Sequence, residues 1–127
     1  MNPFSICVFD VNNLKKMNDK HGHEAGDQLL CEASKIICSF FSHSPVYRIG
    51  GDEFAVILIG ADYFDRKAIL SALRKKSVVN NKKADAVVVA SGLADYDFNK
   101  DKLLKDVFAR ADKDMYQNKK KLKESAK

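Results

Sequence analysis

Two adjacent acidic residues, Asp52 and Glu53, follow a pair of glycines and lie between two apolar segments. The pattern is typical of a β-hairpin, because glycine accepts tight turns and residues 46–49 and 54–59 are rich in strand-forming side chains. Carboxylates side by side at a turn offer the oxygen ligands that Mg²⁺ prefers. Since Gly-Gly and Gly-Asp turns are also common on protein surfaces, the hairpin alone is compatible with a metal site or an ordinary turn.

A second acid, Asp10, lies near the end of a nearly continuous apolar run at residues 4–11. Such a run is typical of a buried central strand, and here it delivers a carboxylate to the edge of the sheet. If this strand and the hairpin are neighbours, Asp10, Asp52 and Glu53 converge, and their mutual repulsion calls for a cation. A bound Mg²⁺ would satisfy that requirement and would leave coordination sites for phosphate oxygens and water.

The rest of the chain predicts the elements that must position these acids. The expected elements are a strand at 4–11, a short helix within 12–19, a helix from 24 to before 44, the hairpin at 46–59, a helix at about 63–76, a turn at 80–83, a strand at 86–94 and a helix at about 102–120. Leu103 and Leu104 are expected on the inward face of the last helix. Grouped helices and paired strands favour an α+β fold in which helices cover one face of a mostly antiparallel sheet.

Composition limits the class of protein. A chain of 127 residues with 46% hydrophobic content is expected to form one globular domain. It contains no apolar run near the roughly 20 residues that span a bilayer and no secretory leader pattern, so a cytoplasmic location is expected. Cys7, Cys31 and Cys38 are expected to be buried as small hydrophobic residues without a function. The net charge of +5 suggests an anionic partner. Nucleic acid is not expected, because the lysines gather near the C-terminus without interleaved aromatic residues.

Four segments resemble the GGDEF domain of bacterial diguanylate cyclases. They lie at residues 9–19, 22–27, 48–54 and 111–119, in family order and at family spacing. The resemblance implies a single GGDEF domain over residues 1–127, with the ferredoxin-like palm fold of nucleotidyl cyclases, a mostly antiparallel sheet flanked by helices. It also implies that two GTP molecules are condensed into cyclic di-GMP with release of two pyrophosphates.

The resemblance assigns metal binding to the carboxylates of Asp10 and Asp52 and to the backbone carbonyl of Val11, with Mg²⁺ or Mn²⁺ as the cofactor. It assigns catalysis to Asp52 and Glu53, which help to activate the attacking ribose hydroxyl. Lys15 is assigned to charge stabilisation in the transition state. Lys119 and Lys123, one helical turn apart, are assigned to the triphosphate. Taken alone, these lysines are equally compatible with solvated surface charges.

The guanine base is assigned to Asn18 and Asp27, whose amide and carboxylate suit its polar edge, and His23 is assigned to nucleotide contact. Each residue has a structural alternative. Asn18 is also suited to capping a turn, Asp27 to a helix surface and His23 to a glycine-rich turn. Gly22 and Gly26 are expected to let the backbone approach the nucleotide closely.

The chain departs from the family pattern at several positions. Asn12 stands where many members carry a second aspartate, Leu122 where glycine is usual, and Lys123 where arginine is usual, which loses a bidentate phosphate contact. Phe41 and Ser44 occupy the ends of the Arg-x-x-Asp inhibitory motif, so product inhibition is not expected. The helix that leads into the first strand in the family is also missing, which suggests a shortened domain.

Diguanylate cyclases work as dimers in which each domain holds one GTP, so the expected partners are GTP and a second GGDEF domain. No membrane contact by this chain is expected, although the domain is compatible with a larger sensor or membrane-bound protein. The alternative is a weak or inactive GGDEF domain that binds GTP or a partner and regulates a neighbouring module. Intact signature acids favour the enzyme, whereas the shortened N-terminus favours the alternative.

Overall fold

Four strands form the sheet around which the chain is organised. The computed structural model describes residues 3–83 and 86–125. The elements follow in the order β1 (Ser5–Val11), α1 (Leu14–His21), α2 (His23–Phe40), β2 (Val46–Arg48), β3 (Glu53–Leu58), α3 (Gly60–Phe64), α4 (Arg66–Asn81), β4 (Val89–Asp95) and α5 (Leu104–Ser125). The described helices are all too short or too polar to cross a lipid bilayer.

The sheet has the strand order β2-β3-β1-β4, and each neighbouring pair is antiparallel. Strands β1 and β2 are joined through α2 and strands β3 and β4 through α4, so the chain forms two interleaved βαβ units. This arrangement confirms the predicted α+β, ferredoxin-like palm. The register pairs Asp10 on β1 with Glu53 on β3, which confirms that the two acidic segments lie on neighbouring central strands.

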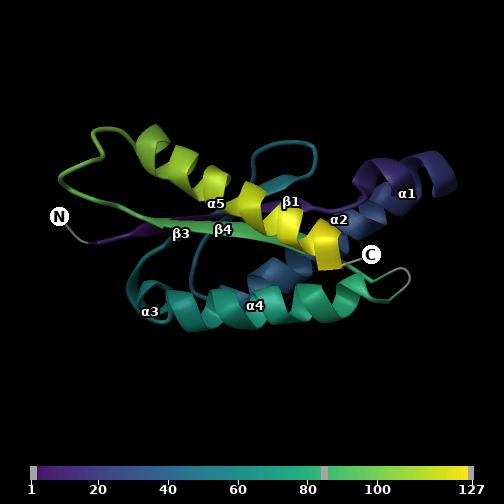
Figure 1. Ribbon diagram of the computed structural model, residues 1–127, viewed down its shortest axis with the longest axis horizontal. Helices are drawn as coiled ribbons and strands as arrows, with labels where there is room; N and C mark the ends of the chain where they lie inside the picture. Colours follow the sequence, from purple (N-terminus) through teal and green to yellow (C-terminus); the bar gives the residue numbers. More distant parts are fainter. Residues whose placement is uncertain (1–2, 84–85, 126–127) are drawn as a thin grey trace.

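Alternation of side chains along β1 divides the core between the two faces of the sheet. Cys7 and Phe9 belong to the cluster that includes residues of α2 and α4. Ile6 and Val8 belong to the cluster that includes residues of α5. Helices therefore lie on both faces of the sheet, with α5 on one side and α2 and α4 on the other (Figure 1). The prediction that helices cover one face was wrong because α5 follows the βαββαβ unit and buries the second face.

Close packing of α5 on β4 depends on small side chains. Ala90, Gly92 and Ala94 alternate on the face of β4 that meets α5. A Cβ atom added to Gly92 would lie 2.1 Å from the carbonyl oxygen of Ala111 and 2.2 Å from the backbone nitrogen of Met115. Only glycine therefore allows the backbone of α5 to lie this close to the sheet.

The predicted helix at 63–76 differs from the observed helices in extent. The structure has a short α3 at Gly60–Phe64 and a longer α4 at Arg66–Asn81, so the predicted turn at 80–83 begins inside a helix. Two tertiary hydrogen bonds explain the extension, because the Asn80 side chain donates to the carbonyl of Val87 and the Asn81 side chain to that of Leu122. The following strand, β4, begins at Val89, three residues later than predicted.

Four residues that the sequence predicts to be buried are instead exposed. Leu103 and Leu104 lie at the start of α5, where the Asp106 carboxylate accepts hydrogen bonds from the backbone N–H groups of residues 102 and 103 and fixes the helix terminus. Cys31 and Cys38 are exposed on α2, whereas Cys7 is buried as predicted. The buried face of α2 is formed by other residues, among them Leu29, Leu30, Ala33 and Ile37.

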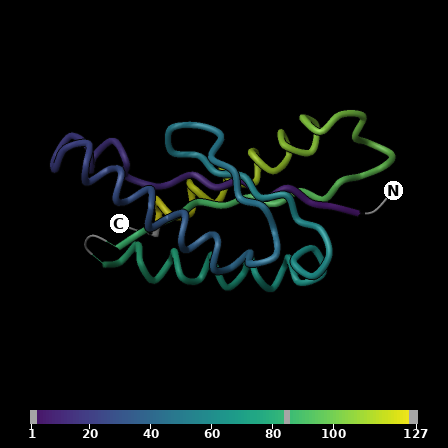
Figure 2. Tube along the Cα trace, turned by 180° about the vertical axis from the view of Figure 1, so that it is seen from behind, coloured from purple at the N-terminus to yellow at the C-terminus, as the bar shows by residue number. Residues whose placement is uncertain are grey.

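The end of the sheet remote from α1 is held by an ion pair between α4 and β4. The Arg66 guanidinium donates to both carboxylate oxygens of Asp95, at 2.8 and 3.1 Å. Burial alone would raise the pKa of Asp95, but hydrogen bonds from Arg66 and Ser5 outweigh burial and hold this pKa below its ordinary value of 3.8. The chain trace seen from behind shows that this end also carries the N-terminal strand residues (Figure 2).

We expect Asp95→Asn to lower the free energy of unfolding by about 1 kcal/mol at pH 7, the scale of a partly exposed ion pair. Because the folded-state pKa is depressed, this contribution is present above the unfolded-state pKa and is lost as the pH falls through the folded-state pKa. Urea denaturation at neutral pH and at pH values below 3.8 should therefore show the difference from the unmodified chain shrinking with acid. Asp19→Asn, at an exposed position on α1, is the control. A difference that is constant with pH would contradict the assignment.

Candidate active site

The alternation that builds the core also decides where Asp10 points. Asp10 continues the row of Ile6 and Val8 on the α5 face of β1 and is only 6% exposed. Lys119 on α5 donates from Nζ to Asp10 Oδ2 at 2.7 Å. The other carboxylate oxygen, Oδ1, is buried and has no hydrogen-bond partner in the described part of the chain. A buried, half-satisfied carboxylate therefore lies at the end of the central strand.

The Gly50–Gly51 hairpin brings its acids to this carboxylate. The Val11 backbone N–H donates to the Asp52 carbonyl at 2.8 Å, which joins the hairpin to the end of β1. Burial raises the pKa of Asp10, and the charge of Asp52 raises it further, while Lys119 opposes both effects. Burial and the charges of Asp10, Asp112 and Asp52 likewise raise the pKa of Glu53. The structure thus confirms the predicted convergence of Asp10, Asp52 and Glu53.

A pocket of about 290 Å³ opens beside these acids, where β1 passes into α1. Its walls come from the β1–α1 segment, the hairpin and the last turns of α5. The lining residues are Val11, Asn12, Asn13, Leu14, Lys15, Lys16, Asp52, Lys119 and Lys123. Five residues predicted for the metal, catalytic and triphosphate roles therefore line a single cavity: Val11, Lys15, Asp52, Lys119 and Lys123.

Two neighbouring asparagines shape this pocket, and the sequence alone does not assign them a role. Asn13 has a φ of 66°, a left-handed conformation that asparagine tolerates better than most residues, and α1 begins directly after it. Asn12 has a buried side-chain oxygen with no hydrogen-bond partner among the described residues. Lys16 also lines the pocket and is exposed. An Asn-Asn pair between a strand and a helix is the signal that identifies this turn.

The residues predicted to bind the guanine nucleotide, Asn18, His23 and Asp27, do not line this pocket. The Asn18 side chain lies against Gly26, where an added Cβ atom would come within 1.7 Å of Asn18 Oδ1. This oxygen is buried and has no hydrogen-bond partner within the described chain. Asp27, which follows Gly26 in the chain, lines a separate groove of about 580 Å³ with Arg48 and Phe54. His23 is exposed at the first position of α2.

This geometry corrects one expectation about the glycines. Gly26 does not open the backbone to a ligand, because the Asn18 side chain fills the space above it. Gly22 has a φ of +88° and open space at its Cβ position, so it allows the chain to turn between α1 and α2. The two glycines therefore place Asn18 and Asp27 relative to each other.

Phe41 and Ser44, which occupy the ends of the Arg-x-x-Asp motif in this chain, both contact other parts of the fold. Phe41 is 1% exposed and its ring packs against Phe9 in the core. Ser44 donates from Oγ to the carboxylate of Asp62, a buried residue of α3. Both side chains are therefore engaged in folding contacts at these positions.

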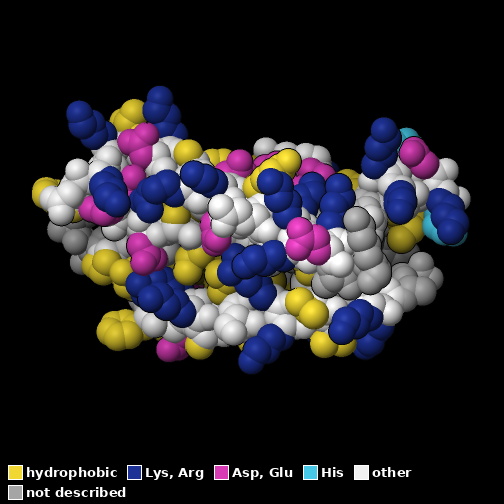
Figure 3. Space-filling view, in the orientation of Figure 1, with side chains coloured by type: hydrophobic (Ala, Val, Ile, Leu, Met, Phe, Trp, Pro, Cys, Tyr) yellow, Lys and Arg dark blue, Asp and Glu magenta, His cyan; other side chains and the backbone are white. Residues whose placement is uncertain are grey.

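A larger groove of about 760 Å³ lies between α4 and α5, and its surface is mainly apolar, with side chains such as Leu70, Val78 and Leu93 beside charged ones. The face that carries α4 and α5 also presents Lys and Arg side chains with hydrophobic ones between them (Figure 3). Arg74 lines this groove but donates to Asp114 and to the carbonyl of Ser91. The converging carboxylates lie at the smaller pocket, which makes the smaller pocket the candidate active site.

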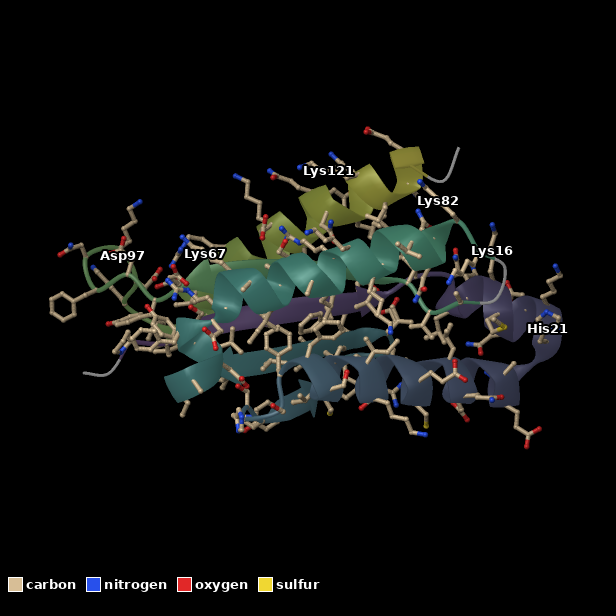
Figure 4. The ribbon with its side chains drawn as sticks, turned by 90° about the horizontal axis from the view of Figure 1, so that it is seen from below. Lys16, His21, Lys67, Lys82, Asp97 and Lys121 are labelled. Carbon is tan, nitrogen blue, oxygen red and sulfur yellow. The ribbon has the colours of Figure 1, made fainter. Side chains whose placement is uncertain are left out.

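The candidate site lies at one end of the molecule. Lys16 and His21 lie at the α1 end, beside the candidate site, whereas Lys67 and Asp97 lie at the opposite end (Figure 4). A palm-like sheet that presents paired acids on its two central strands, with lysines around them, defines the nucleotidyl cyclase and polymerase class of fold.

Comparison with known proteins narrows this class. The family model described as "Diguanylate cyclase, GGDEF domain" matches residues 1–125. The chain belongs to the GGDEF domain family, that of the diguanylate cyclases.

Individual relatives agree with this assignment. The chain is 34% identical over 120 residues to "Diguanylate cyclase A" from Treponema denticola, a match that covers 91% of this chain and 32% of that protein. It is 51% identical over 57 residues to "Diguanylate cyclase DgcS" from Shewanella oneidensis, covering 44% of this chain and 19% of that protein. The chain therefore spans a third or less of the length of these curated relatives.

Solved structures confirm the fold. The active GGEEF domain of a diguanylate cyclase from Vibrio cholerae superimposes with a TM-score of 0.75 at 25% identity, over 94% of this chain and 78% of that one. The GGDEF domain of DgcB from Caulobacter crescentus, solved with c-di-GMP, gives a TM-score of 0.73 at 25% identity, over 94% of this chain and 73% of that one.

Proposed function

We propose that this chain is a diguanylate cyclase domain that condenses two GTP molecules into cyclic di-GMP and releases two pyrophosphates. The observation that carries the proposal is the pocket at the β1–α1 junction, where Lys15, Asp52 and Lys119 share one cavity beside Asp10. Carboxylates for a cation and lysines for a triphosphate are the complementary halves of a nucleotide site. Relatives named as diguanylate cyclases support the choice of reaction.

Mg²⁺ or Mn²⁺ suits the donors of this site. The described residues contain no group of three or more His, Cys, Asp or Glu side chains arranged to hold a metal ion. Two carboxylates do approach each other, Asp10 and Asp52, and Asp10 Oδ1 has no protein partner in the described structure. This is the donor set of a cation that takes one or two carboxylates and completes its shell with water and phosphate. Asp10, Asp52 and the Val11 carbonyl would hold the ion, which would neutralise charge on the phosphates.

The protein's own groups have separate tasks in the proposed reaction. One carboxylate of the adjacent pair Asp52 and Glu53 accepts the proton that leaves the ribose 3′-hydroxyl as its oxygen bonds to the α-phosphorus of the other GTP and the bond to pyrophosphate breaks. The raised pKa of Glu53 favours this role, because a carboxylate of higher basicity takes a proton more readily. Lys15, exposed in the first turn of α1, stabilises the charge that develops on the phosphates. Lys119 and Lys123 bind the triphosphate.

Each domain holds one GTP in this proposal, so the reaction needs two domains face to face. The exposure of Gly50 and Gly51 at the tip of the hairpin supports this arrangement, because a second domain must reach the site from that side. Formation of cyclic di-GMP should therefore increase more steeply than in proportion to protein concentration. In solution the partner would be a second copy of this domain.

Guanine recognition by Asn18 and Asp27 is tested by Gly26→Ala. Alanine should keep or raise the free energy of unfolding, since it favours helix over glycine and displaces only the flexible end of Asn18. Loss of the Asn18 hydrogen bond to the base should weaken GTP binding about tenfold. Isothermal titration calorimetry measures the affinity for GTP. The affinity for inorganic triphosphate, which has no base, is the control and should not change. Equal loss of affinity for both ligands would contradict the assignment of Asn18 to the base.

The function itself is tested by incubating the purified chain with GTP and Mg²⁺ over a range of protein concentrations. Chromatography should reveal cyclic di-GMP and pyrophosphate in a ratio of one to two. GTP binding without product at high protein concentration would instead support the regulatory alternative. The absence of GTP binding would refute the cyclase proposal and the GTP-binding form of the alternative.

A further inference from the structure

The Asp10 carboxylate is paired in an uneven way. Lys119 donates to Oδ2 at 2.7 Å, whereas Oδ1 is buried without a hydrogen-bond partner in the described residues. The side chain of Asp10 is 8% exposed and that of Lys119 is 38% exposed. The lysine therefore reaches from the solvent side to cover a carboxylate that is otherwise enclosed by the protein. A buried carboxylate needs such a partner to remain charged.

Lys119 has room to leave this position. It lines the pocket that also contains Lys15 and Lys123, so its ammonium group can rotate from the carboxylate into the open part of the cavity. The α5 backbone cannot follow this movement, because α5 is packed closely on Gly92 of β4. A long, flexible side chain on a fixed helix restricts the movement to the lysine itself.

We propose that Lys119 is a tethered counter-ion that holds Asp10 in the absence of metal and is displaced onto the triphosphate when a divalent cation binds the same carboxylate. This inference rests on the proposed function of the same site. The cation would bind through Oδ1, which has no partner among the described residues, and its charge would repel the ammonium group on Oδ2 and drive it from the carboxylate. When the cation binds alone, nothing replaces the lost ion pair between Lys119 and Asp10. When the triphosphate is also present, it offers the lysine a new anionic partner.

One consequence is that cation and nucleotide bind cooperatively. Each ligand favours the arrangement in which Lys119 has left Asp10, so each raises the affinity of the other by the same factor. Metal without nucleotide should bind weakly, because Lys119 competes with the cation for Asp10. The nearby carboxylates of Asp52 and Glu53 should not attract the cation strongly enough to overcome this competition. Lys119 is therefore a substrate-binding residue whose side chain also couples the two halves of the site.

Isothermal titration of Mn²⁺ in the absence of nucleotide tests the exchange. Lys119→Gln removes the competing charge and should bind Mn²⁺ about tenfold more tightly than the unmodified chain, while binding of GTP in the presence of EDTA becomes weaker. Lys119→Arg keeps the charge and should keep the weak Mn²⁺ affinity. The matched control is Lys120→Gln, which removes the same charge from the next residue of α5, where the side chain lies over Tyr116. Its Mn²⁺ affinity should stay within about twofold.

A measurement on the unmodified chain avoids dependence on variant stability. Reductive methylation read by mass spectrometry should label Lys119 at least about threefold faster at a saturating concentration of Mn²⁺ than without metal, with Lys120 unchanged. Unchanged labelling of Lys119, or an Mn²⁺ affinity in folded Lys119→Gln that equals or falls below that of the unmodified chain, would overturn the proposal. None of these readouts needs turnover, so a failure of the cyclase proposal and a failure of the exchange are distinguishable.

Discussion

Asp52→Asn should lower the rate of cyclic di-GMP formation by at least about a hundredfold. The variant loses the carboxylate charge that binds the cation and helps to activate the attacking hydroxyl. The fold should survive the change. The bond that joins the hairpin to β1 runs from the Val11 N–H to the Asp52 backbone carbonyl, which the variant retains. Loss of the carboxylate also removes a charge that raises the pKa values of Asp10 and Glu53. Stability should therefore be unchanged or slightly higher.

Product chromatography and thermal unfolding together check this prediction. Asp65→Asn makes the same substitution at an exposed residue between α3 and α4 and should leave product formation unaltered. A folded Asp52→Asn variant that kept more than a tenth of the rate, or a loss of activity that came only from unfolding, would contradict the role of Asp52.

Gly92→Ala should strongly destabilise the fold, because the glycine lies against the backbone of α5. The new Cβ would lie 2.1 Å from one backbone atom of α5 and 2.2 Å from another. Backbone atoms cannot rotate away as a side chain can, so the whole helix must move. We expect a loss of at least about 3 kcal/mol in the free energy of unfolding, at the upper end of the cost of overpacking. Because α5 carries Lys119, the same shift should weaken the contact with Asp10.

Gly51→Ala provides the stability control, because an added Cβ there meets no atom within 4 Å. Urea denaturation followed by circular dichroism should show a loss below about 1 kcal/mol for this variant. A comparable loss for the two variants would mean that close packing of α5 on β4 does not explain the requirement for glycine at position 92.

Much of the site can be predicted from the sequence because its residues lie at the ends of strongly patterned elements. The apolar run of β1 identifies a central strand, and Asp10 stands out because a charged residue in such a run needs a partner. The glycine pair identifies the hairpin and places Asp52 at its turn. Once the two strands are adjacent, the convergence of the acids follows from the register alone.

The parts that the sequence does not predict depend on contacts between distant elements. The pairing of Lys119 with Asp10 spans 109 residues and depends on α5 crossing the sheet in one orientation. The extension of α4 through Asn80 and Asn81 depends on acceptors on other segments. The exposure of Cys31 and Cys38 depends on which face of α2 the sheet covers. Local propensity carries no information about these tertiary choices.

A crystal structure of the chain with Mg²⁺ and a non-hydrolysable GTP analogue tests the proposed site most directly. We expect the triphosphate in the pocket between the start of α1 and the end of α5, the cation at Asp10 and Asp52, and the ammonium group of Lys119 on a phosphate oxygen. A nucleotide bound instead in the apolar groove between α4 and α5, with the contact between Lys119 and Asp10 intact, would contradict the proposed site.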